Sequence, residues 1–293
     1  MPKIAAFPKA FIDELCVTGS MTLRRWIELA ASLDIDGLEF YHGFPGLEKS
    51  SVAAEARRIA ADHGLSIPML CCSPDFTHPD PAFRRKEIDG EKRWMDVAAG
   101  LGCRFCRVLS GQRRPGVSRE DGIRYAAESI LCCLEHAEDT GITLNIENHY
   151  KDHHWKYREF AQKMDVFCEL VDRIESPNFG VNFDPSNTIL AGEDPIELLR
   201  RVKHRVVTMH ASDRYLAGGT LEDLKKAEGV EGYARQLRHG VIGEGMNDYD
   251  KIFETLKGAG FDGWVSIEDG MEGMEQLRKS ADFLRAKIRR HWS

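Results

Sequence analysis

The chain has 293 residues, of which 42% are hydrophobic and 30% charged, a balance typical of a globular protein with a large core. Its formal net charge of −7 weighs against a nucleic-acid partner or an anionic membrane surface and favours a small-molecule ligand. No apolar run is long enough to span a membrane, and the N-terminus lacks a signal-peptide pattern, so we expect a cytoplasmic protein.

Strand and helix patterns alternate along the whole chain. The strand patterns are eight short apolar runs, at residues 3–7, 36–41, 66–72, 104–110, 142–147, 179–184, 205–210 and 263–268. The helix patterns lie at residues 22–33, 51–63, 82–101, 118–140, 158–174, from 194 onward, 250–257 and 273–290. Strict alternation of this kind indicates parallel strands joined by crossover helices.

A count of eight strands favours a closed barrel over an open doubly wound sheet. No glycine-rich GxGxxG motif opens the first helix, which also weighs against a dinucleotide-binding fold. No linker-like run divides the chain, so the sequence predicts a single (β/α)8 TIM barrel over residues 1–293. The long excursion at residues 211–247, after the seventh strand, is expected to be an active-site loop.

Eight cysteines are present, and Cys103 and Cys106 form a CxxC pair of the kind used in zinc and redox sites. No second pair lies at zinc-finger spacing, and the neighbouring cysteines at 71–72 and 132–133 occupy apolar segments. We therefore expect these cysteines to be small, reduced core residues.

Four of the strand patterns end in a side chain that can bind a metal ion: Glu147, Asp184, His210 and Glu268. In a parallel barrel the carboxyl ends of all strands face one side, so residues far apart in sequence can converge there. Three carboxylates and one imidazole make a mostly oxygen site, which suits Mn²⁺, Mg²⁺ or Co²⁺ better than a structural zinc ion. We expect one divalent metal ion as the cofactor.

The residues around these positions form five short motifs. They are Asn145-Ile146-Glu147-Asn148-His149, Asn182-Phe183-Asp184-Pro185-Ser186-Asn187, Met209-His210-Ala211-Ser212-Asp213-Arg214, Gly243-Glu244-Gly245-Met246-Asn247-Asp248 and Ser266-Ile267-Glu268-Asp269-Gly270. In this order and at barrel spacing, they resemble the xylose-isomerase-like barrel superfamily, the sugar phosphate isomerase/epimerase group. The resemblance covers essentially the whole chain and implies a metal ion held by the four strand-end residues.

The resemblance also implies a reaction. In the ketose 3-epimerases of this group, two metal-binding glutamates move the proton next to a sugar carbonyl, and Glu147 and Glu268 match them. The expected activity is therefore a metal-dependent isomerisation or epimerisation of a sugar or keto-sugar, through proton abstraction α to a carbonyl and a metal-stabilised enediolate.

Two departures leave a second branch open. Asn187 stands where the epimerase pattern has a histidine, and the polar loop after the fifth strand carries His149 and Lys151. His149 is either a separate acid or base or a residue of the surface. If it is an acid or base, the same start could lead to β-elimination, as the resemblance to inosose dehydratases and to the catalytic subunits of C-glycoside deglycosidases implies.

Arg214, Asn187, Lys151 and Glu39 are the expected substrate-binding residues, since each lies near the carboxyl end of a strand. Asp213 is expected to orient Arg214 or His210. A phosphodiesterase of the apurinic endonuclease type shares the barrel and ranks below these readings, because the chain is acidic. The expected partner is a small sugar, with a homo-oligomer or a second enzyme subunit possible and no nucleic acid or membrane.

Overall fold

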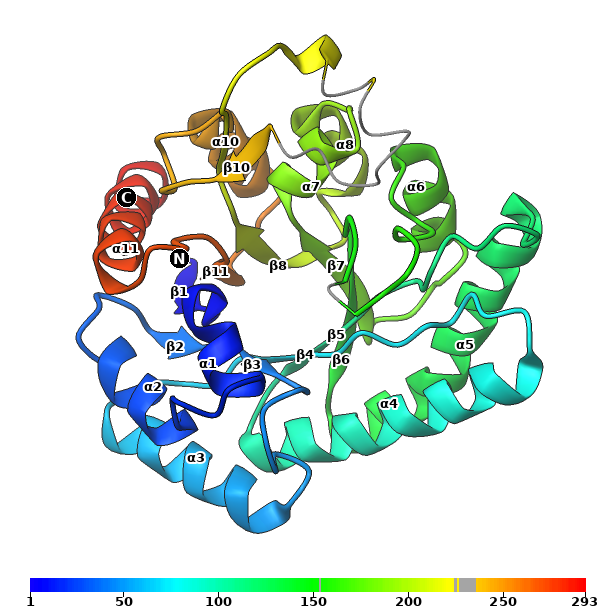
Figure 1. Ribbon diagram of the computed structural model, residues 1–293, viewed down its shortest axis with the longest axis horizontal. Helices are drawn as coiled ribbons and strands as arrows, with labels where there is room; N and C mark the ends of the chain where they lie inside the picture. Colours follow the sequence, from blue (N-terminus) through cyan, green and yellow to red (C-terminus); the bar gives the residue numbers. More distant parts are fainter. Residues whose placement is uncertain (153, 224–225, 227–235) are drawn as a thin grey trace.

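The computed structural model describes residues 1–152, 154–223, 226 and 236–293. In this part of the chain nine parallel strand segments form one sheet that curls into a ring, with helices on its outside (Figure 1). The segments are β1 (Lys3–Ala6), β2 (Gly37–Leu38), β3 (Phe40–Tyr41), β4 (Met69–Cys71), β5 (Phe105–Val108), β6 (Thr143–Glu147), β7 (Phe179–Phe183), β8 (Val206–Ala211) and β11 (Trp264–Ile267). The chain is a (β/α)8 TIM barrel, as predicted.

The second barrel strand is divided at Glu39 into β2 and β3. On one side β2 pairs with β1, and on the other β3 pairs with β4. Two backbone hydrogen bonds continue the ring through the division, from Glu39 N to Ala6 O at 3.0 Å and from Leu38 N to Ser66 O at 2.8 Å. The sheet order, β2-β1-β11-β8-β7-β6-β5-β4-β3, therefore closes on itself at this strand.

Helices alternate with the strands around the ring, as the sequence predicts. They are α1 (Ile12–Cys16), α2 (Leu23–Ala30), α3 (Ser50–Asp62), α4 (Pro81–Leu101), α5 (Arg119–Thr140), α6 (Met164–Asp172), α7 (Pro185–Leu190), α8 (Pro195–Val202), α10 (Tyr249–Gly258) and α11 (Met274–Trp292). A short 3₁₀ helix, η1 (Lys9–Phe11), follows β1. Local chemistry fixes several ends: Thr22 caps α2 through the N–H of Arg25, and Gly102 and Gly141 end α4 and α5 at φ of +83° and +71°.

The predicted helix over residues 158–174 is partly wrong, because α6 begins only at Met164. The segment before it belongs to a loop that folds back on neighbouring backbone, with Glu159 N bonded to Tyr150 O at 2.9 Å and Phe160 N to Gly111 O at 2.7 Å. These tertiary hydrogen bonds replace the helical ones, so the apolar period of the segment did not decide its structure.

The excursion after the seventh strand contains an antiparallel strand pair, β9 (Arg214–Leu216) and β10 (Leu237–His239). Residues 224–225 and 227–235 of this excursion lie outside the described residues. The role of the excursion as an active-site loop stays a prediction.

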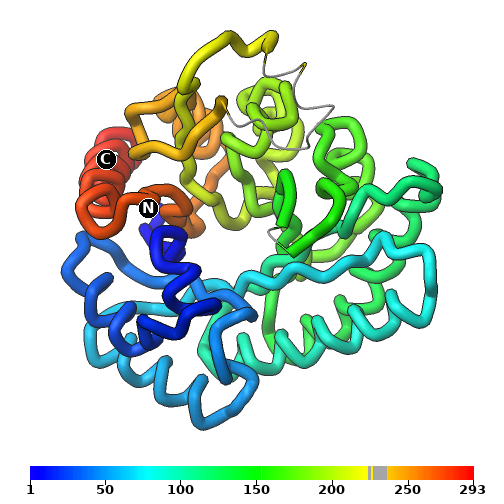
Figure 2. The backbone as a smooth tube through the Cα atoms, in the orientation of Figure 1, coloured from blue at the N-terminus to red at the C-terminus, as the bar shows by residue number. Residues whose placement is uncertain are grey.

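The apolar core lies between the ring and the outer helices and includes the fully buried Trp26, Phe167 and Phe253. Figure 2 shows both ends of the chain on the same side of the molecule, where α11 packs beside β1. Among the helices described, none combines the length and the apolar character that crossing a membrane requires.

Candidate functional site

The four strand-end residues with metal-binding side chains converge at the carboxyl end of the ring. Glu147 is the last residue of β6, Asp184 follows β7, His210 lies in β8 and Glu268 follows β11. One ligand atom from each lies within 4.8 Å of the others, and all four side chains are buried. The register of four parallel strands therefore brings together residues that span more than a hundred positions of sequence. We refer to Glu147, Asp184, His210 and Glu268 as the ligand cluster.

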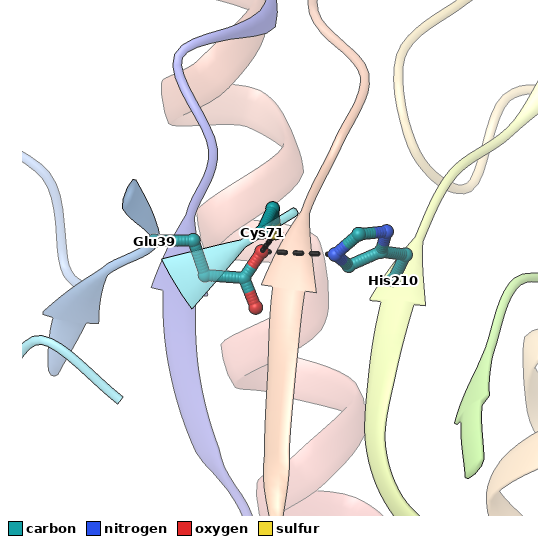
Figure 3. A group of neighbouring side chains, drawn as sticks. All are labelled: Glu39, Cys71 and His210. Atoms are coloured by element: carbon teal, nitrogen blue, oxygen red, sulfur yellow. Dashed lines mark hydrogen bonds and ion pairs between the residues drawn. The ribbon is translucent and has the colours of Figure 1, made fainter. Parts of the chain in front are cut away.

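The imidazole of His210 is held in one orientation by a carboxylate from the second barrel strand, which β1 and β11 separate from β8 in the ring. Its Nε2 lies 2.9 Å from Oε2 of Glu39, which is completely buried beside Cys71 (Figure 3). Its Nδ1 has no hydrogen-bond partner among the described residues and lies 3.4 Å from Glu147 Oε2 and 3.5 Å from Glu268 Oε2. A histidine that binds a metal ion usually pairs one ring nitrogen with a carboxylate and binds the ion through the other nitrogen. His210 has this arrangement, because Glu39 faces Nε2 and carboxylate oxygens surround Nδ1.

Asp184 serves the local structure and the ligand cluster at the same time. Its Oδ1 caps α7 by accepting hydrogen bonds from the N–H groups of Ser186 at 2.8 Å and Asn187 at 3.1 Å. The hydroxyl of Ser212 donates to the same oxygen at 2.6 Å. Burial, followed by the charges of Glu268 and Glu147, raises the pKa of Asp184 to about 8.

The carboxylate of Glu147 accepts one side-chain hydrogen bond at each of its oxygens. Arg107, which lies in β5 and is 5% exposed, donates to Glu147 Oε2 at 2.6 Å, and the Asn187 amide donates to Oε1 at 3.0 Å. Burial alone would raise the pKa of Glu147, but His210 and Arg107 outweigh it and hold the pKa at about 2. The carboxylate is therefore ionised at neutral pH.

Glu268 has its own cation. Lys9, in η1 after the first strand, donates to Glu268 Oε1 at 3.0 Å. Burial opposes ionisation, but Lys9 and then His210 hold the pKa of Glu268 well below 4.5. Neither Lys9 nor Arg107 was predicted as a site residue; an arginine inside the apolar run 104–110 was a signal that could have identified Arg107.

The donor set of this region suits a divalent cation. Carboxyl groups outnumber the basic side chains that face them: Glu39, Glu147, Asp184 and Glu268 are buried around Arg107, Lys9 and His210. The available donors are carboxylate oxygens and Nδ1 of His210, which has no hydrogen-bond partner among the described residues. The residues present therefore fit a divalent metal ion.

The predicted substrate-binding residues fall into different surroundings. Asn187 donates to Glu147 and to Asp184 Oδ2, both at 3.0 Å, so it braces the ligand cluster, and Glu39 is buried behind His210 instead of at the rim. Lys151 is half-buried, and within the described residues no hydrogen bond joins it to the ligand cluster.

His149 lies behind the ligand cluster in the loop after β6. Its Nδ1 is 3.4 Å from Oε2 of Glu159. Glu159 is fully buried, and its other oxygen, Oε1, accepts hydrogen bonds from the N–H and the hydroxyl of Ser110. Burial lowers the pKa of His149, but Glu159 and then Glu147 outweigh this effect and raise the pKa above 6.5. This shift favours the protonated form of the ring.

Arg214 begins β9 and is 4% exposed. Asp213, expected to orient Arg214 or His210, binds backbone instead: its carboxylate accepts the N–H groups of Gly243 at 2.9 Å and Gly245 at 3.1 Å. This carboxylate shapes the turn of the Gly-Glu-Gly motif, and the orienting role at His210 belongs to Glu39.

A histidine that the sequence did not single out lies nearby. His239, in β10, pairs through Nδ1 with Asp269, the residue after Glu268, and the other oxygen of Asp269 accepts the N–H of Asp213. No local pattern around His239 indicates this pairing, because it depends on how the strand pair β9–β10 lies on the barrel.

Comparison with known proteins gives the same fold and family. The description "Xylose isomerase-like TIM barrel" matches residues 27–287. The chain is 26% identical over 165 residues to 3-oxo-isoapionate decarboxylase of Pectobacterium atrosepticum, covering 56% of this chain and 51% of that protein. It is 29% identical over 195 residues to inosose dehydratase of Geobacillus kaustophilus, covering 62% and 61%.

A solved structure, that of the IOLI protein with a bound zinc atom, superimposes with a TM-score of 0.78 at 16% identity and covers 99% of each chain. The chain spans about half the length of the first curated relatives that it matches. Because the family description matches most of the chain, from α2 to α11, the chain belongs to the xylose isomerase-like TIM barrel family.

Proposed function

We propose that this protein is a divalent-metal-dependent enzyme that acts on a sugar or keto-sugar by removing a proton α to a carbonyl, as an isomerase, epimerase or lyase. The observation that carries the proposal is the ligand cluster itself. Its three carboxylates surround an imidazole nitrogen that has no hydrogen-bond partner in the part of the chain that the structure describes. A bound divalent ion would polarise the carbonyl of a substrate and so make the neighbouring proton more acidic.

Glu147 and Glu268 are suited to move that proton. Both stay ionised at neutral pH, because Arg107 and His210 act on Glu147 while Lys9 and His210 act on Glu268. An ionised carboxylate at the carboxyl end of the barrel can accept a proton from a substrate bound there. They come from β6 and from the end of β11, so one can take a proton and the other return it at the opposite face.

Elimination is the alternative outcome of the same first step. It needs an acid for the leaving group, and His149, which faces the carboxylate of Glu159 in the loop after β6, is the candidate. Two proteins of similar sequence are named as a decarboxylase and a dehydratase, and these names also favour cleavage of a bond near a carbonyl group. A phosphodiesterase activity ranks third, since the chain carries a net charge of −7.

The first test is metal content. Wild-type protein, Glu268→Gln and His210→Ala are stripped with a chelator, reloaded with Mn²⁺ and measured by elemental analysis. We expect about one ion per chain in the wild type and a large loss in both variants. Glu275→Gln is the matched control, because Glu275 is a surface carboxylate on α11 that pairs with Lys279 and lies outside the ligand cluster.

The second test is the reaction. Keto-sugars and keto-cyclitols are incubated in heavy water with and without Mn²⁺, and deuterium at the α-carbon is followed by NMR. Metal-dependent exchange that Glu147→Gln and Glu268→Gln abolish supports the proposal. Wild-type protein that remains metal-free after Mn²⁺ addition, or that exchanges no substrate of this class, contradicts it.

A further inference from the structure

A second group of metal-binding side chains lies outside the ligand cluster, between the ring and α4. Cys72 follows β4, Cys106 lies in β5, and Glu91 faces both from α4, which runs along the outside of the ring in Figure 1. All three residues are buried, with Glu91 only 2% exposed. The two sulfur atoms are 3.8 Å apart, and Cys106 Sγ is 3.2 Å from Glu91 Oε1.

These distances are the ones that a tetrahedral metal ion requires. Zinc binds thiolate sulfur at about 2.3 Å and carboxylate oxygen at about 2.0–2.2 Å. In a regular tetrahedron those bond lengths separate two sulfurs by about 3.8 Å and a sulfur from an oxygen by about 3.5 Å. The Cys72–Cys106 separation matches already, and the contact of Cys106 with Glu91 needs to open by only a few tenths of an ångström.

The electrostatics of Glu91 point the same way. Its close hydrogen-bond partner is the Cys106 thiol, and among the residues that the structure describes it forms no ion pair. A buried carboxylate without a cation is costly, and a metal ion bound by two thiolates would supply the missing charge.

A cavity gives an ion access to this cluster. It has a volume of about 160 Å³, and its lining includes Cys72, Glu91 and His42. The Nε2 atom of His42 is buried and has no hydrogen-bond partner in the part of the chain described. Burial lowers the pKa of His42 to about 4, so the ring is neutral, which is the form that binds metals.

We propose that Cys72, Glu91 and Cys106 form a second metal site, for a thiophilic divalent ion such as Zn²⁺, with its fourth position open to the cavity. Its two sulfur ligands distinguish it from the oxygen-rich ligand cluster, which prefers harder ions. Binding replaces the thiol protons, which pass to solvent, so the ion binds more tightly as the pH rises. This site does not depend on the proposed function.

Cadmium tests the proposal, because its bonds to thiolate absorb in the ultraviolet. Chelator-stripped, reduced protein is titrated with Cd²⁺ while absorbance and bound metal are followed. We expect a thiolate-to-cadmium band that saturates at one ion per chain in the wild type and persists in Glu268→Gln. Cys106→Ser should lose the band, and the matched control Cys103→Ser, which changes the other cysteine of the CxxC pair, should keep it.

Glu91→Gln keeps both thiols and is informative even if Cys106→Ser fails to fold. Its affinity for Cd²⁺ should fall at least about tenfold, the smallest loss typical of removing even an outer partner of a metal site. Absence of the band in the wild type would overturn the proposal, as would its persistence in Cys106→Ser. Formation of a Cys72–Cys106 disulfide in air, with no metal bound after reduction, would also overturn it.

Discussion

Replacing Asp184 by asparagine should make the metal-free protein more stable while removing its response to metal. Asp184, Glu147 and Glu268 place ligand atoms within 4.8 Å of one another in a buried site. At an effective dielectric constant of about 20, each pair of like charges at that distance costs about 3 kcal/mol. Asp184 takes part in two such pairs, and its attraction to His210 offsets about one of them, so neutralising it should gain about 3 kcal/mol.

Asparagine preserves most of what Asp184 does for the local fold. As an N-cap residue it is equivalent to aspartate, so the hydrogen bonds from Ser186 and Asn187 backbone to the cap of α7 persist. Its amide group cannot accept the hydrogen bond that Asn187 Nδ2 now gives to Oδ2, which costs about 1 kcal/mol. The net expectation is about 2 kcal/mol of added stability in the presence of a chelator.

The assay is urea denaturation in chelator and in Mn²⁺ at about one hundred times the dissociation constant. The ion should raise the free energy of unfolding of the wild type by about 2.7 kcal/mol and that of Asp184→Asn by almost nothing. The stability advantage that Asp184→Asn has in chelator should therefore vanish or reverse in Mn²⁺. Asp194→Asn is the matched control, because Asp194 also precedes a proline and caps α8, far from the ligand cluster. An Asp184→Asn protein less stable than the wild type in chelator would refute the reasoning.

Three further changes test other parts of the structure. Glu39→Gln weakens the interaction that orients His210, so the affinity for Mn²⁺ should fall about 10- to 100-fold. Competition with a chromogenic chelator measures this affinity, and an unchanged value would exclude an orienting role for Glu39. Asp250 is partly exposed, and Lys287 first of all lowers its pKa to about 2. A lowered pKa stabilises the fold above the unfolded value of 3.8, so Asp250→Asn should cost about 0.5–1 kcal/mol at neutral pH. This cost should disappear as the pH falls from about 4 to 2, and urea melts that show the same difference at pH 7 and 3 would contradict it. Phe253→Ala empties a fully buried position and should cost about 3–5 kcal/mol in urea denaturation, and a loss below about 1 kcal/mol would show that the site collapses.

Much of the barrel could be predicted because its elements carry local signals. Apolar runs of strand length alternate with helical periods, and residues such as Thr22, Gly102 and Gly141 mark helix ends through their own backbone chemistry. Prediction failed at residues 158–163, where hydrogen bonds to Tyr150 and Gly111 hold the backbone. Those contacts depend on how the segment packs against other loops, and the spacing of its own apolar residues carries no information about that packing.

Four potential ligands could be placed at strand ends from the amino-acid sequence alone, because a strand ends where its apolar run ends and parallel strands end on the same face. The partners of those ligands could not be predicted in this way, because they depend on the packing of distant segments. Glu39 reaches His210 across 171 positions of sequence, and Lys9 reaches Glu268 across 259. Such pairs form because closing the ring leaves only the first and eighth strands between the second and the seventh, and places η1 beside the eighth. Burial and charge therefore act on residues that carry no sequence signal for each other.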